Sequence, residues 1–549
     1  MEQADSVLRL DAQWIDYLLV AVYFVFVLGI GWAARRRVSS SIDYFLSGRG
    51  LPAWVTGLAF ISANLGAVEI IGHSANGAMY GMQTMHYFWI GAVPAMIFLG
   101  IVMMPFYYGS KVRSVPEFML RRFGPTSHLV NAISFALAQL LIAGVNLFLL
   151  AKVVESLLGW PLWVTLLVAA AIVLSYITLG GLSAAIYNEV LQFFVIVAAF
   201  VPLTVIGLNA VGGWSGLKER LGESHFQTWP ASELSGFDNP ALSAAGIVFG
   251  LGFVLSFGYW TTNFVEVQRS MAAESMSAAR RTPIIGSFPK MLIPFVVVIP
   301  GMVAGAIVTP IANGSADPND AVLYLMRDLL PNGLLGVAIA GLLAAFMAGM
   351  AANISAFNTV VSYDIWQTYI VKDRPDGYYL RVGRIATCAA AAIAVGTALI
   401  AAEFGNIMDY LQTLFGFFNA PLFATFLLGM FWRRMSPTAG WTGLVSGTLA
   451  AIVFWLFTVG ENPTIELPGQ GAAFIAAGVA FAVDIVVSVV VTQFTAPKPE
   501  RELVGFVYGA TPKERLRDPR EAELPFYRRT IPLGIMGLGL VVALNLVFL

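Results

Sequence analysis

Three residues with polar or flexible character interrupt an apolar stretch near the start of the chain. In FISANLGAVEIIG, residues 60 to 72, Asn64, Gly66 and Glu69 fall within six positions of one another. An amide and a carboxylate offer hydrogen bonds to a polar solute, and a glycine weakens the helix around them. Because a carboxylate in apolar surroundings is costly, we expect all three to line a cavity. The alternative is that Gly66 serves close helix packing and Glu69 pairs with a buried base.

The composition places this stretch in a membrane protein. Of 549 residues, 58% are hydrophobic and 11% are charged, and the mean hydropathy is +0.77, which excludes an ordinary soluble chain. A spanning helix needs about 20 mostly apolar residues. The segment 12–34 is too long for a signal-peptide core and is read as a retained helix. Fourteen segments qualify, near 12–34, 53–79, 84–108, 127–158, 162–180, 184–211, 241–266, 285–311, 333–370, 380–403, 406–431, 437–459, 471–494 and 529–549.

The basic residues predict which helix ends face the cytoplasm. Most of the 31 lysines and arginines fall in one set of alternate loops, and the positive-inside rule makes that set cytoplasmic. Fourteen crossings then leave both termini on the extracytoplasmic side. We expect one integral domain over 1–549 in the lipid bilayer of the plasma (inner) membrane, with a cytoplasmic loop at 495–528. The opposite set of loops holds only Arg9, Lys218, Arg220 and Arg327.

The remaining chemistry-bearing residues argue against an enzyme. Cys388 is the single cysteine, the four histidines are dispersed, and no HExxH, GxSxG or GxxxxGK[ST] motif occurs. We predict no cofactor, no transition-metal site and no nucleic-acid partner. A polytopic membrane enzyme or a solute sensor is a remote alternative, because it would need a catalytic motif or a larger signalling domain than 495–528.

Two spans carry related interruptions. The second is interrupted at 63–66, and the seventh carries Gly250, Gly252 and Gly258 in FGLGFVLSFGYW, five spans later. Helix breaks at matching positions in two halves are typical of inverted-repeat transporters, in which unwound backbone near the midplane meets the solute. We predict a first repeat over 53–211 and a second over 241–431. An extra N-terminal helix at 12–34 and additional C-terminal helices within 437–549 flank them.

Six motifs occur in order along the chain. They are DYFLSGRGLPAWVTGLAFISANLGA (43–67), SVPEFMLRRFG (114–124), YITLGGLSAAIYNEVLQFF (176–194), VQRSMAAES (267–275), VSYDIW (361–366) and FLLGMFWRR (426–434). With these motifs the chain resembles the sodium:solute symporter family, which includes the sodium/glucose cotransporters, over nearly its whole length. The resemblance implies an all-α integral membrane fold of about fourteen transmembrane helices, built as a leucine-transporter-like 5+5 inverted repeat with additional helices.

The resemblance also implies a solute site. Glu69 stands where sugar-transporting members have a glutamine, Phe88 where a galactose transporter has a glutamate, and Ser256 where an asparagine occurs. Tyr87 falls at an outer-gate aromatic and Tyr259 at an inner-gate tyrosine. The likeness is therefore to the site and only partly to the ligand. The implied solute-binding residues are Glu69, Tyr87, Phe88, Ser256, Tyr259, Lys290 and Gln412.

These side chains suit a solute with many hydroxyl groups. Lys290 offers three donors, Gln412 a donor and an acceptor, and Glu69 acceptors only, while the ring of Tyr259 can stack on a sugar face. Each also has a structural interpretation. Lys290 could reach along the membrane toward a helix end, Gln412 and Ser256 could bond between helices, and the three aromatic residues could be core.

The ion site is where the chain departs from its relatives. The family's shared sodium site implies backbone carbonyls of Ser62, Leu65 and Ala345, and two hydroxyls at the positions that Ala348 and Gly349 occupy here. Both hydroxyls are absent. By analogy with other hard cations, sodium needs about five or six oxygens, so the site is degenerate even if Ser62 adds its own hydroxyl. We expect sodium to stabilise the protein weakly or not at all.

Two acidic residues are alternative carriers of the coupling. Burial favours the neutral form of a carboxyl, so Glu69, or Glu189 beside the GGLSA turn, could load and release a proton. Glu189 stands where relatives have an aspartate, and its structural interpretation is a carboxylate held by local basic residues. We expect a secondary active transporter that imports a small polar solute, most simply a sugar or polyol, by sodium symport with alternating access. A proton-coupled symporter or an uncoupled uniporter is the alternative.

Overall fold

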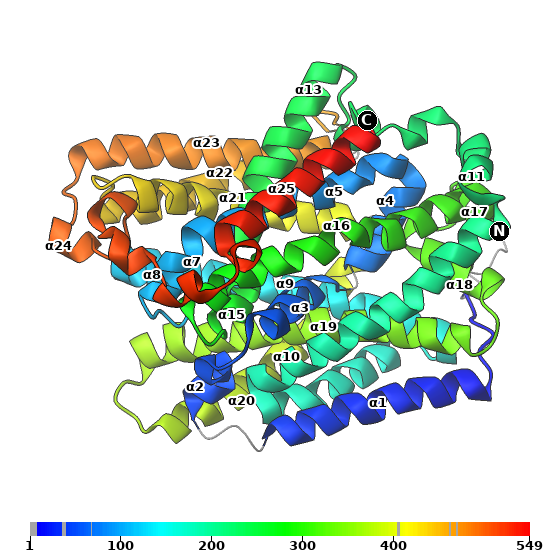
Figure 1. Cartoon of the computed structure of the whole chain (residues 1–549), viewed down its shortest axis with the longest axis horizontal. Coiled ribbons are helices and arrows are strands. Elements are labelled where there is room, and N and C mark those ends of the chain that lie inside the picture. The colour runs from blue at the N-terminus through cyan, green and yellow to red at the C-terminus, as the bar shows by residue number, and fades with distance from the viewer. Residues whose placement is uncertain (1–7, 36–39, 67, 403–406, 461–462, 468–469) are drawn as a thin grey trace.

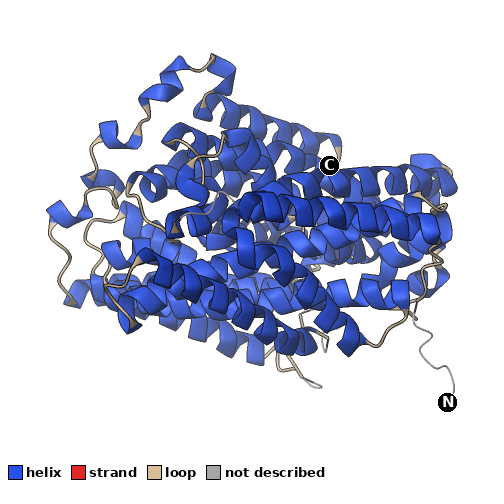
Figure 2. Cartoon of the chain, turned by 90° about the horizontal axis from the view of Figure 1, so that it is seen from below, coloured by secondary structure: helices blue, strands red, loops and turns tan. Residues whose placement is uncertain are grey.

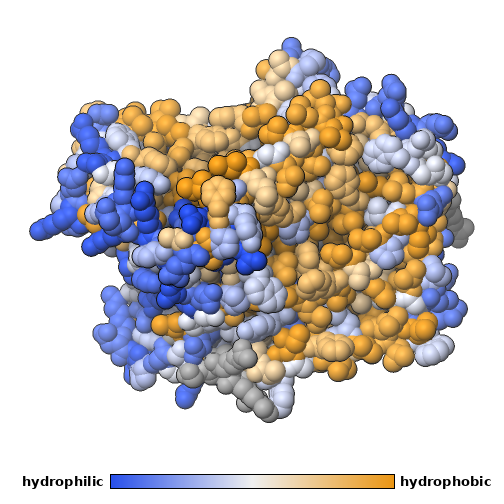
Figure 3. Space-filling model, in the orientation of Figure 1, coloured by the Kyte–Doolittle hydropathy of each residue, from blue (hydrophilic) through white to orange (hydrophobic). Residues whose placement is uncertain are grey.

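Long helices run side by side along the molecule, and the connecting loops gather at its two ends (Figure 1, Figure 2). The computed structural model describes residues 8–35, 40–66, 68–402, 407–460, 463–467 and 470–549. Twelve helical stretches among these residues are long and apolar enough to cross a membrane. On the face drawn in Figure 3, a broad apolar belt lies between two hydrophilic ends. The all-helical membrane fold predicted from composition is confirmed.

The helices are bounded as follows, in chain order. The first half holds α1 (Trp14–Arg35), α2 (Ser41–Leu46), α3 (Ala53–Asn64), α4 (His73–Tyr80), α5 (His86–Trp89), α6 (Val93–Phe98), α7 (Met104–Gly109), α8 (Val115–Arg122), α9 (Pro125–Leu158), α10 (Leu162–Ala210), α11 (Gly213–Leu221) and α12 (Ser232–Ser235). The second half holds α13 (Pro240–Ala245), α14 (Phe257–Thr262), α15 (Phe264–Met271), α16 (Met276–Ile307), α17 (Thr309–Ala312), α18 (Ala321–Leu329), α19 (Leu334–Thr359), α20 (Asp376–Ala401), α21 (Ile407–Phe431), α22 (Pro437–Leu456), α23 (Gly471–Phe494), α24 (Glu500–Leu503) and α25 (Thr530–Val547). Four π-helices join them, η2 (Val68–Gly72), η4 (Leu99–Met103), η6 (Gly246–Ser256) and η8 (Val360–Ile370).

The predicted count of fourteen spans is approximate because two of them are short or broken. The second span is divided between α3 and the apolar stretch Val68–Gly109, which also carries the third. The fifth and sixth spans both lie in α10, and Gly181 separates them with φ 57° and ψ −149°. A Cβ at Gly181 would lie 2.5 Å from the carbonyl oxygen of Tyr44, so this sharp bend requires a glycine.

The break in the second span falls where the sequence predicts it. The α3 helix ends at Asn64, and Leu65 caps it with ψ 49°, its N–H donating to Ile61 O at 2.9 Å. The chain then resumes as the π-helix η2 before α4 begins at His73. Because π-helical turns leave backbone groups outside the regular ladder and occur often at functional sites, Glu69 stands at an irregular part of the backbone.

The seventh span differs from the prediction. Gly250, Gly252 and Gly258 do not interrupt it; they lie in a continuous helix, π-helical over η6 and α-helical over α14, that ends at Thr262 before the extended residue Asn263. A Cβ at Gly258 would lie 2.7 Å from the carbonyl oxygen of Asn419. These glycines therefore permit close helix packing, and the irregular backbone comes a turn later than predicted.

Burial separates a central group of helices from peripheral ones. In the most apolar window of Leu334–Ile370, 89% of residues are buried, against 28% for Trp14–Ala34 and 22% for α25. The α19 helix packs against α9, α10 and α3, and α16 packs against α3 and α4. The α1 and α25 helices therefore face lipid over most of their length, while the break in the second span lies between central helices.

Both ends of the described chain lie on the same side as the long segment 212–239. The hydroxyl of Thr228 in that segment donates to the carbonyl of Phe548 at 2.5 Å. Near the other terminus, Leu10 N–H donates to Ser156 O at the end of α9, and Asp16 accepts from the N–H groups of Gly333 and Gly336, both at 2.7 Å. An even number of crossings is consistent with this arrangement.

Candidate solute and ion site

A cavity of about 90 Å³ lies where the break in the second span faces α14, α16, α19 and α21. It is smaller than the ~300–1,000 Å³ of common ligand pockets, so the space between its walls is narrow in this state. Six of the seven predicted solute residues line it, which leaves out only Phe88. The six are Glu69, Tyr87, Ser256, Tyr259, Lys290 and Gln412.

Lys290 carries a buried ammonium group into this cavity. Its side chain is 2% exposed, and Nζ donates to Glu69 Oε2 at 2.8 Å and to the side-chain oxygen of Asn64. The ring centroids of Phe88 and Trp260 lie 4.7 and 5.3 Å from Nζ, which adds cation–π attraction. Lys290 therefore points inward and does not extend toward a membrane surface. Phe88, behind the lysine, supports it without lining the cavity.

Glu69 faces the cavity while paired with two basic side chains. Its Oε2 accepts from Lys290 and also lies 3.4 Å from Nε2 of His73, one turn later. The carboxylate is 13% exposed. Both interpretations of Glu69 therefore hold together, because it pairs with a buried base and also lines the cavity. With one ammonium and one carboxylate in contact, the wall carries little net charge when His73 is neutral.

Tyr259 links the cavity to a second carboxyl group. Its hydroxyl accepts from Nδ2 of Asn64 at 3.1 Å and donates to Glu266 Oε1 at 2.8 Å. The ring packs against Phe415, with centroids 4.7 Å apart. Because Tyr259 lines the cavity and Glu266 does not, the tyrosine hydroxyl stands between the cavity and the carboxyl group of Glu266.

The other predicted solute residues differ in how tightly they are held. Gln412 lines the cavity, and the contact found for its amide nitrogen is the weak acceptor Sδ of Met408 at 3.7 Å. Ser256 lies on the opposite wall, where it packs against Gly91. Tyr87 donates to Oε1 of Gln470 at 2.8 Å. An amide contacted mainly by a thioether keeps much of its hydrogen-bonding capacity for a solute.

A polar link starts at Tyr87 in the cavity wall and leads away from the cavity. Gln470 accepts from Tyr87 and donates to the carboxylate of Asp409, so the start of α23 is tied to α5 and α21. Gln83, near Tyr87, accepts from the N–H of Leu234 at 2.9 Å. These contacts join the long segment 212–239 and the loop before α23 over the cavity.

One of the predicted ion positions, Gly349, lies beside the helix break, where it passes close to Gly66. A Cβ on Gly349 would lie 3.1 Å from Gly66 Cα and 2.7 Å from Oδ1 of Asn146. Ser62, Leu65, Ala345 and Ala348 are fully buried. The hydroxyl of Ser62 has no hydrogen-bond partner in the described structure. The side-chain oxygen of Asn146 therefore lies beside Gly349, where one of the two expected hydroxyls is missing.

Glu189 does not join the other predicted ion positions. It forms a fully buried, two-pronged ion pair with Arg269, with Nη2 2.5 Å from Oε1 and Nε 3.3 Å from Oε2. Arg269 also donates to Val265 O and to Gln268 Oε1. The interpretation of Glu189 as a carboxylate held by a local base describes this geometry.

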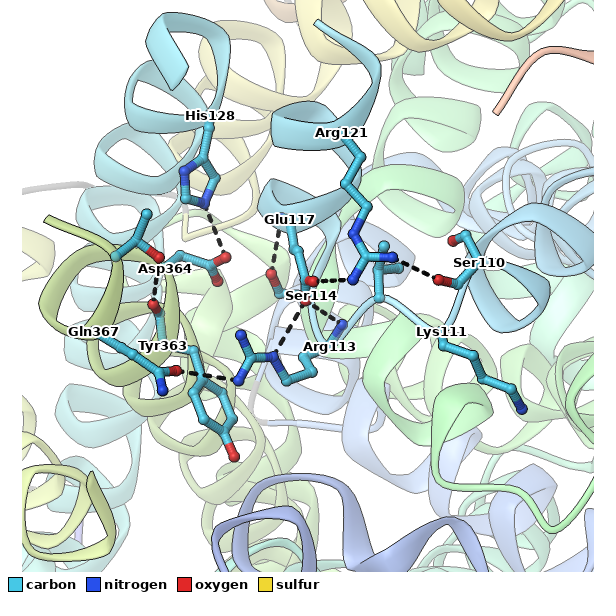
Figure 4. A network of polar contacts seen from close by, with 12 residues as sticks. Ser110, Lys111, Arg113, Ser114, Glu117, Arg121, His128, Tyr363, Asp364 and Gln367 are labelled. Atoms are coloured by element: carbon cyan, nitrogen blue, oxygen red, sulfur yellow. Dashed lines mark hydrogen bonds and ion pairs between the residues drawn. The ribbon is translucent and has the colours of Figure 1, made fainter. Parts of the chain in front are cut away.

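A charged network ties the loop before α9 to the end of the ninth span (Figure 4). Arg113 and Arg121 both contact Glu117 in α8, at 3.3 and 2.5 Å, and Arg113 also donates to Gln367 Oε1 in η8 at 3.1 Å. Burial alone would raise the pKa of Glu117, but the two arginines outweigh it and hold that pKa below its ordinary value.

The same network contains a buried histidine–carboxylate contact. His128 Nε2 at the start of α9 lies 2.9 Å from Asp364 Oδ1 in η8, and both side chains are buried. His128 Nδ1 lies 2.8 Å from the hydroxyl of Tyr369. The end of the ninth span is thereby fixed against α8 and α9.

Four residues near the cavity were not among the solute-binding and ion-binding residues predicted from the sequence. Asn64 was predicted to line a cavity, but its contacts with Lys290 and Tyr259 were not. His73 and Asn146 are isolated polar residues in apolar helices, a signal that could have marked them. Glu266 was also detectable as a lone acidic residue just before VQRSMAAES.

Comparison with known proteins decides the family. The model of the sodium:solute symporter family matches residues 44–447. The chain belongs to the sodium:solute symporter family. A sodium/glucose cotransporter of Vibrio parahaemolyticus is 29% identical over 468 residues, covering 81% of this chain and 85% of the relative. A mouse sodium/myo-inositol cotransporter 2 is 28% identical over 474 residues, covering 80% and 69%.

Solved structures support the fold of this symporter. It is similar to a substrate-bound, outward-open Na+-coupled sialic acid symporter with a TM-score of 0.75 and 18% identity, over 88% of this chain and 98% of that one. It is also similar to Mhp1, a nucleobase-cation-symport-1 family transporter, with a TM-score of 0.51 and 14% identity, over 85% and 98%. The symporter is thus a polytopic membrane transporter with a leucine-transporter-like fold.

Proposed function

We propose that this symporter imports a small, neutral, polyhydroxylated solute, a sugar or polyol, together with sodium by alternating access. The observation that carries the proposal is the Lys290–Glu69 pair in the wall of a cavity at a helix break. A buried ion pair adds little to stability, so its place at a cavity favours a binding role. Ammonium and carboxylate together offer donors and acceptors to hydroxyl groups.

The self-neutralising pair favours a neutral solute over a charged one. An anionic solute bound to Lys290 would be repelled by the adjacent Glu69, and a cationic solute bound to Glu69 would be repelled by the adjacent Lys290. Tyr259 supplies a ring for the apolar face of a sugar, and Gln412 an amide for its hydroxyls. Relatives named for glucose and myo-inositol at 26–29% identity support this class of solute without selecting one member.

Sodium is the ion that the oxygen ligands suit once the side chain of Asn146 is counted among them. The carbonyls of Ser62, Leu65 and Ala345 supply three oxygens, and the side chains of Ser62 and Asn146 supply two more, which approaches the oxygen-only shell of a hard cation. Solute and ion then bind on either side of one helix break. Each stabilises the same conformer, and this mutual stabilisation is the coupling.

A proton-coupled symporter or an uncoupled uniporter is the second candidate. It is favoured by one observation, the absence of hydroxyl groups at Ala348 and Gly349. Without enough oxygens around it, sodium would not replace its hydration shell at this position. Glu69, Glu189 or another buried carboxyl would then carry the coupling, or none would.

We also propose the arrangement in the plasma (inner) membrane that the basic loops favour. The charged network of Figure 4 and the loop 495–528 face the cytoplasm, and both termini face outward. Within this arrangement, residues 53–211 and 241–431 form the two inverted repeats.

Uptake into proteoliposomes tests the proposal. Purified protein is reconstituted, and a panel of labelled sugars, polyols, amino acids and sialic acid is offered under an inward sodium, potassium or proton gradient. We expect uptake of a sugar or polyol that only the sodium gradient drives above equilibrium. Proton-driven or gradient-independent uptake would establish the second candidate, and uptake restricted to charged solutes would overturn the assignment of the cavity.

A further inference from the structure

Glu266 is a buried carboxyl group without a countercharge. It is 0% exposed, its Oε1 accepts from the hydroxyl of Tyr259 at 2.8 Å, and its Oε2 has no hydrogen-bond partner. The ion pairs found among the described residues do not include it. An unpaired carboxylate oxygen in a dry site costs several kcal/mol, and the group lowers that cost by binding a proton.

The charged groups around Glu266 are already committed to other partners. Arg269, one turn later on α15, gives Nε and Nη2 to Glu189 on α10, and gives Nη1 to Val265 O and Gln268. Lys290 on α16 is bound to Glu69 and Asn64, with His73 on the far side of Glu69. Two cations thus face two carboxylates, and ionised Glu266 would leave the cluster with an uncompensated negative charge.

The hydrogen bond between Tyr259 and Glu266 couples the charge of Glu266 to the opening of the cavity. Tyr259 lines the cavity, whereas Glu266 lies beyond it, near the start of α15, which the short loop 272–275 joins to the basic first turns of α16 with Arg280 and Arg281. For the cavity to open toward that loop, the tyrosine ring must leave its position between Asn64 and Glu266. Water then reaches the carboxyl group and stabilises its ionised form.

We propose that Glu266 is a proton-binding site that keeps the basic side of the cavity closed. The carboxyl group holds a proton on Oε2 while Tyr259 is bonded to Oε1, and it releases that proton to the basic side as the tyrosine departs. It takes a proton back from the same side when the path closes. Lower pH on that side therefore favours the closed state, because a ligand shifts an equilibrium toward the state that binds it more tightly.

Infrared spectroscopy tests the protonation directly and needs neither solute nor sodium. Purified wild-type protein should show the carbonyl absorption of a protonated carboxylic acid near neutral pH, and Glu266→Gln should lack that component. Glu523→Gln, which alters an exposed carboxyl in the loop 495–528, is the matched control and should retain it. A component that persists unchanged in Glu266→Gln would overturn the proposal.

Cysteine labelling tests the link to access. In a Cys388→Ser background, Val265→Cys places a thiol in the cavity wall beside Glu266, and its reaction with a water-soluble reagent is measured in nanodiscs relative to the denatured protein. We expect this ratio to rise at least about threefold from about pH 6 to about pH 8 and to stay low and flat with Glu266→Gln. An equal pH dependence in both backgrounds would overturn the coupling.

Two further measurements check the fold of the variants and the path of the proton. Glu266→Gln keeps the size of the side chain, and its elution as a monodisperse species shows that it folds. A proton carried across the membrane with each solute would acidify the vesicle interior in proportion to uptake, and that result would overturn release and rebinding on one side. Neither labelling nor infrared absorption depends on the identity of the solute, so failure here leaves the proposed function untouched.

Discussion

The side-chain oxygen of Asn146 occupies the space that a side chain on Gly349 would need. A Cβ on Gly349 would lie 2.7 Å from that oxygen, closer than van der Waals contact allows. An amide on α9 therefore stands where a hydroxyl on α19 is missing. We interpret this arrangement as an exchange: α19 lacks a hydroxyl oxygen at this position, and the neighbouring helix α9 supplies an amide oxygen.

Gly349→Ser should destabilise the protein by about 1–3 kcal/mol, because overpacking a filled core forces side chains off their rotamers. Adding Asn146→Ala should recover most of that loss, since the small residue vacates the space. Thermal unfolding measures both. Gly396→Ser, at a helical glycine with open space around it, is the control and should change little. Equal destabilisation by both glycine substitutions would contradict the exchange.

Asn146→Ala should remove a sodium-specific stabilisation. If Asn146 and Ser62 complete the oxygen set, wild-type protein should unfold at a higher temperature in sodium than in potassium, by an amount that grows with the logarithm of sodium concentration. This revises the weak response expected from the sequence. Ser134→Ala on the same helix, whose hydroxyl bonds only to its own turn, should leave the difference intact. An equal unfolding temperature of the wild-type protein in sodium and in potassium would refute this set of sodium ligands.

Lys290→Ala should abolish solute binding and also destabilise the fold by about 3–5 kcal/mol, because Glu69 is left as an uncompensated buried charge. The double variant Lys290→Ala, Glu69→Gln should regain stability without regaining binding. Calorimetry on the purified variants separates the two effects. Recovery of binding in the double variant would show that the lysine only balances charge.

Glu117 should contribute a pH-dependent share of stability. Its folded-state pKa lies below the unfolded value, so its stabilisation is present in full above an unfolded pKa of about 4.3 and is lost as the pH falls through the folded value. Arg113 and Arg121 are 35% and 41% exposed, so we expect Glu117→Gln to cost only about 0.5–1 kcal/mol at neutral pH. The gap in unfolding temperature between wild type and Glu117→Gln should stay constant down to about pH 4.3 and narrow as the pH falls below it, whereas a gap that stays constant there too would exclude a role for its charge.

Local sequence could predict the spans and the first helix break, because hydropathy and the Asn64–Gly66 interruption are properties of short segments. It predicted the wrong effect for Gly250, Gly252 and Gly258, since glycine serves a helix break and close packing alike, and only the neighbours decide which. Phe474 and Asn419, which lie close to two of these glycines, are remote in sequence.

The sequence predicted which residues line the site better than it predicted which of them contact one another. Glu69 and Lys290 are separated by 221 residues, and nothing local indicates that they meet. The role proposed for Asn146 depends on its closeness to Gly66, in the helix break, and Gly349, on α19, both remote in sequence. The motif around Ala348 and Gly349 contains nothing that points to an oxygen on α9.

The contact between Lys290 and Glu69 has an electrical consequence. Two opposite charges that move as one contribute nothing to the charge displaced when the cavity changes sides, so under the proposed function this pair adds nothing to the voltage response of the ion. Each elementary charge drawn through 100 mV supplies about 2.3 kcal/mol, which corresponds to a roughly 50-fold concentration ratio of a neutral solute at 25 °C. Glu69→Gln would leave an unbalanced ammonium in the carrier, and the empty protein would then move charge of its own, so that its return step becomes voltage-dependent.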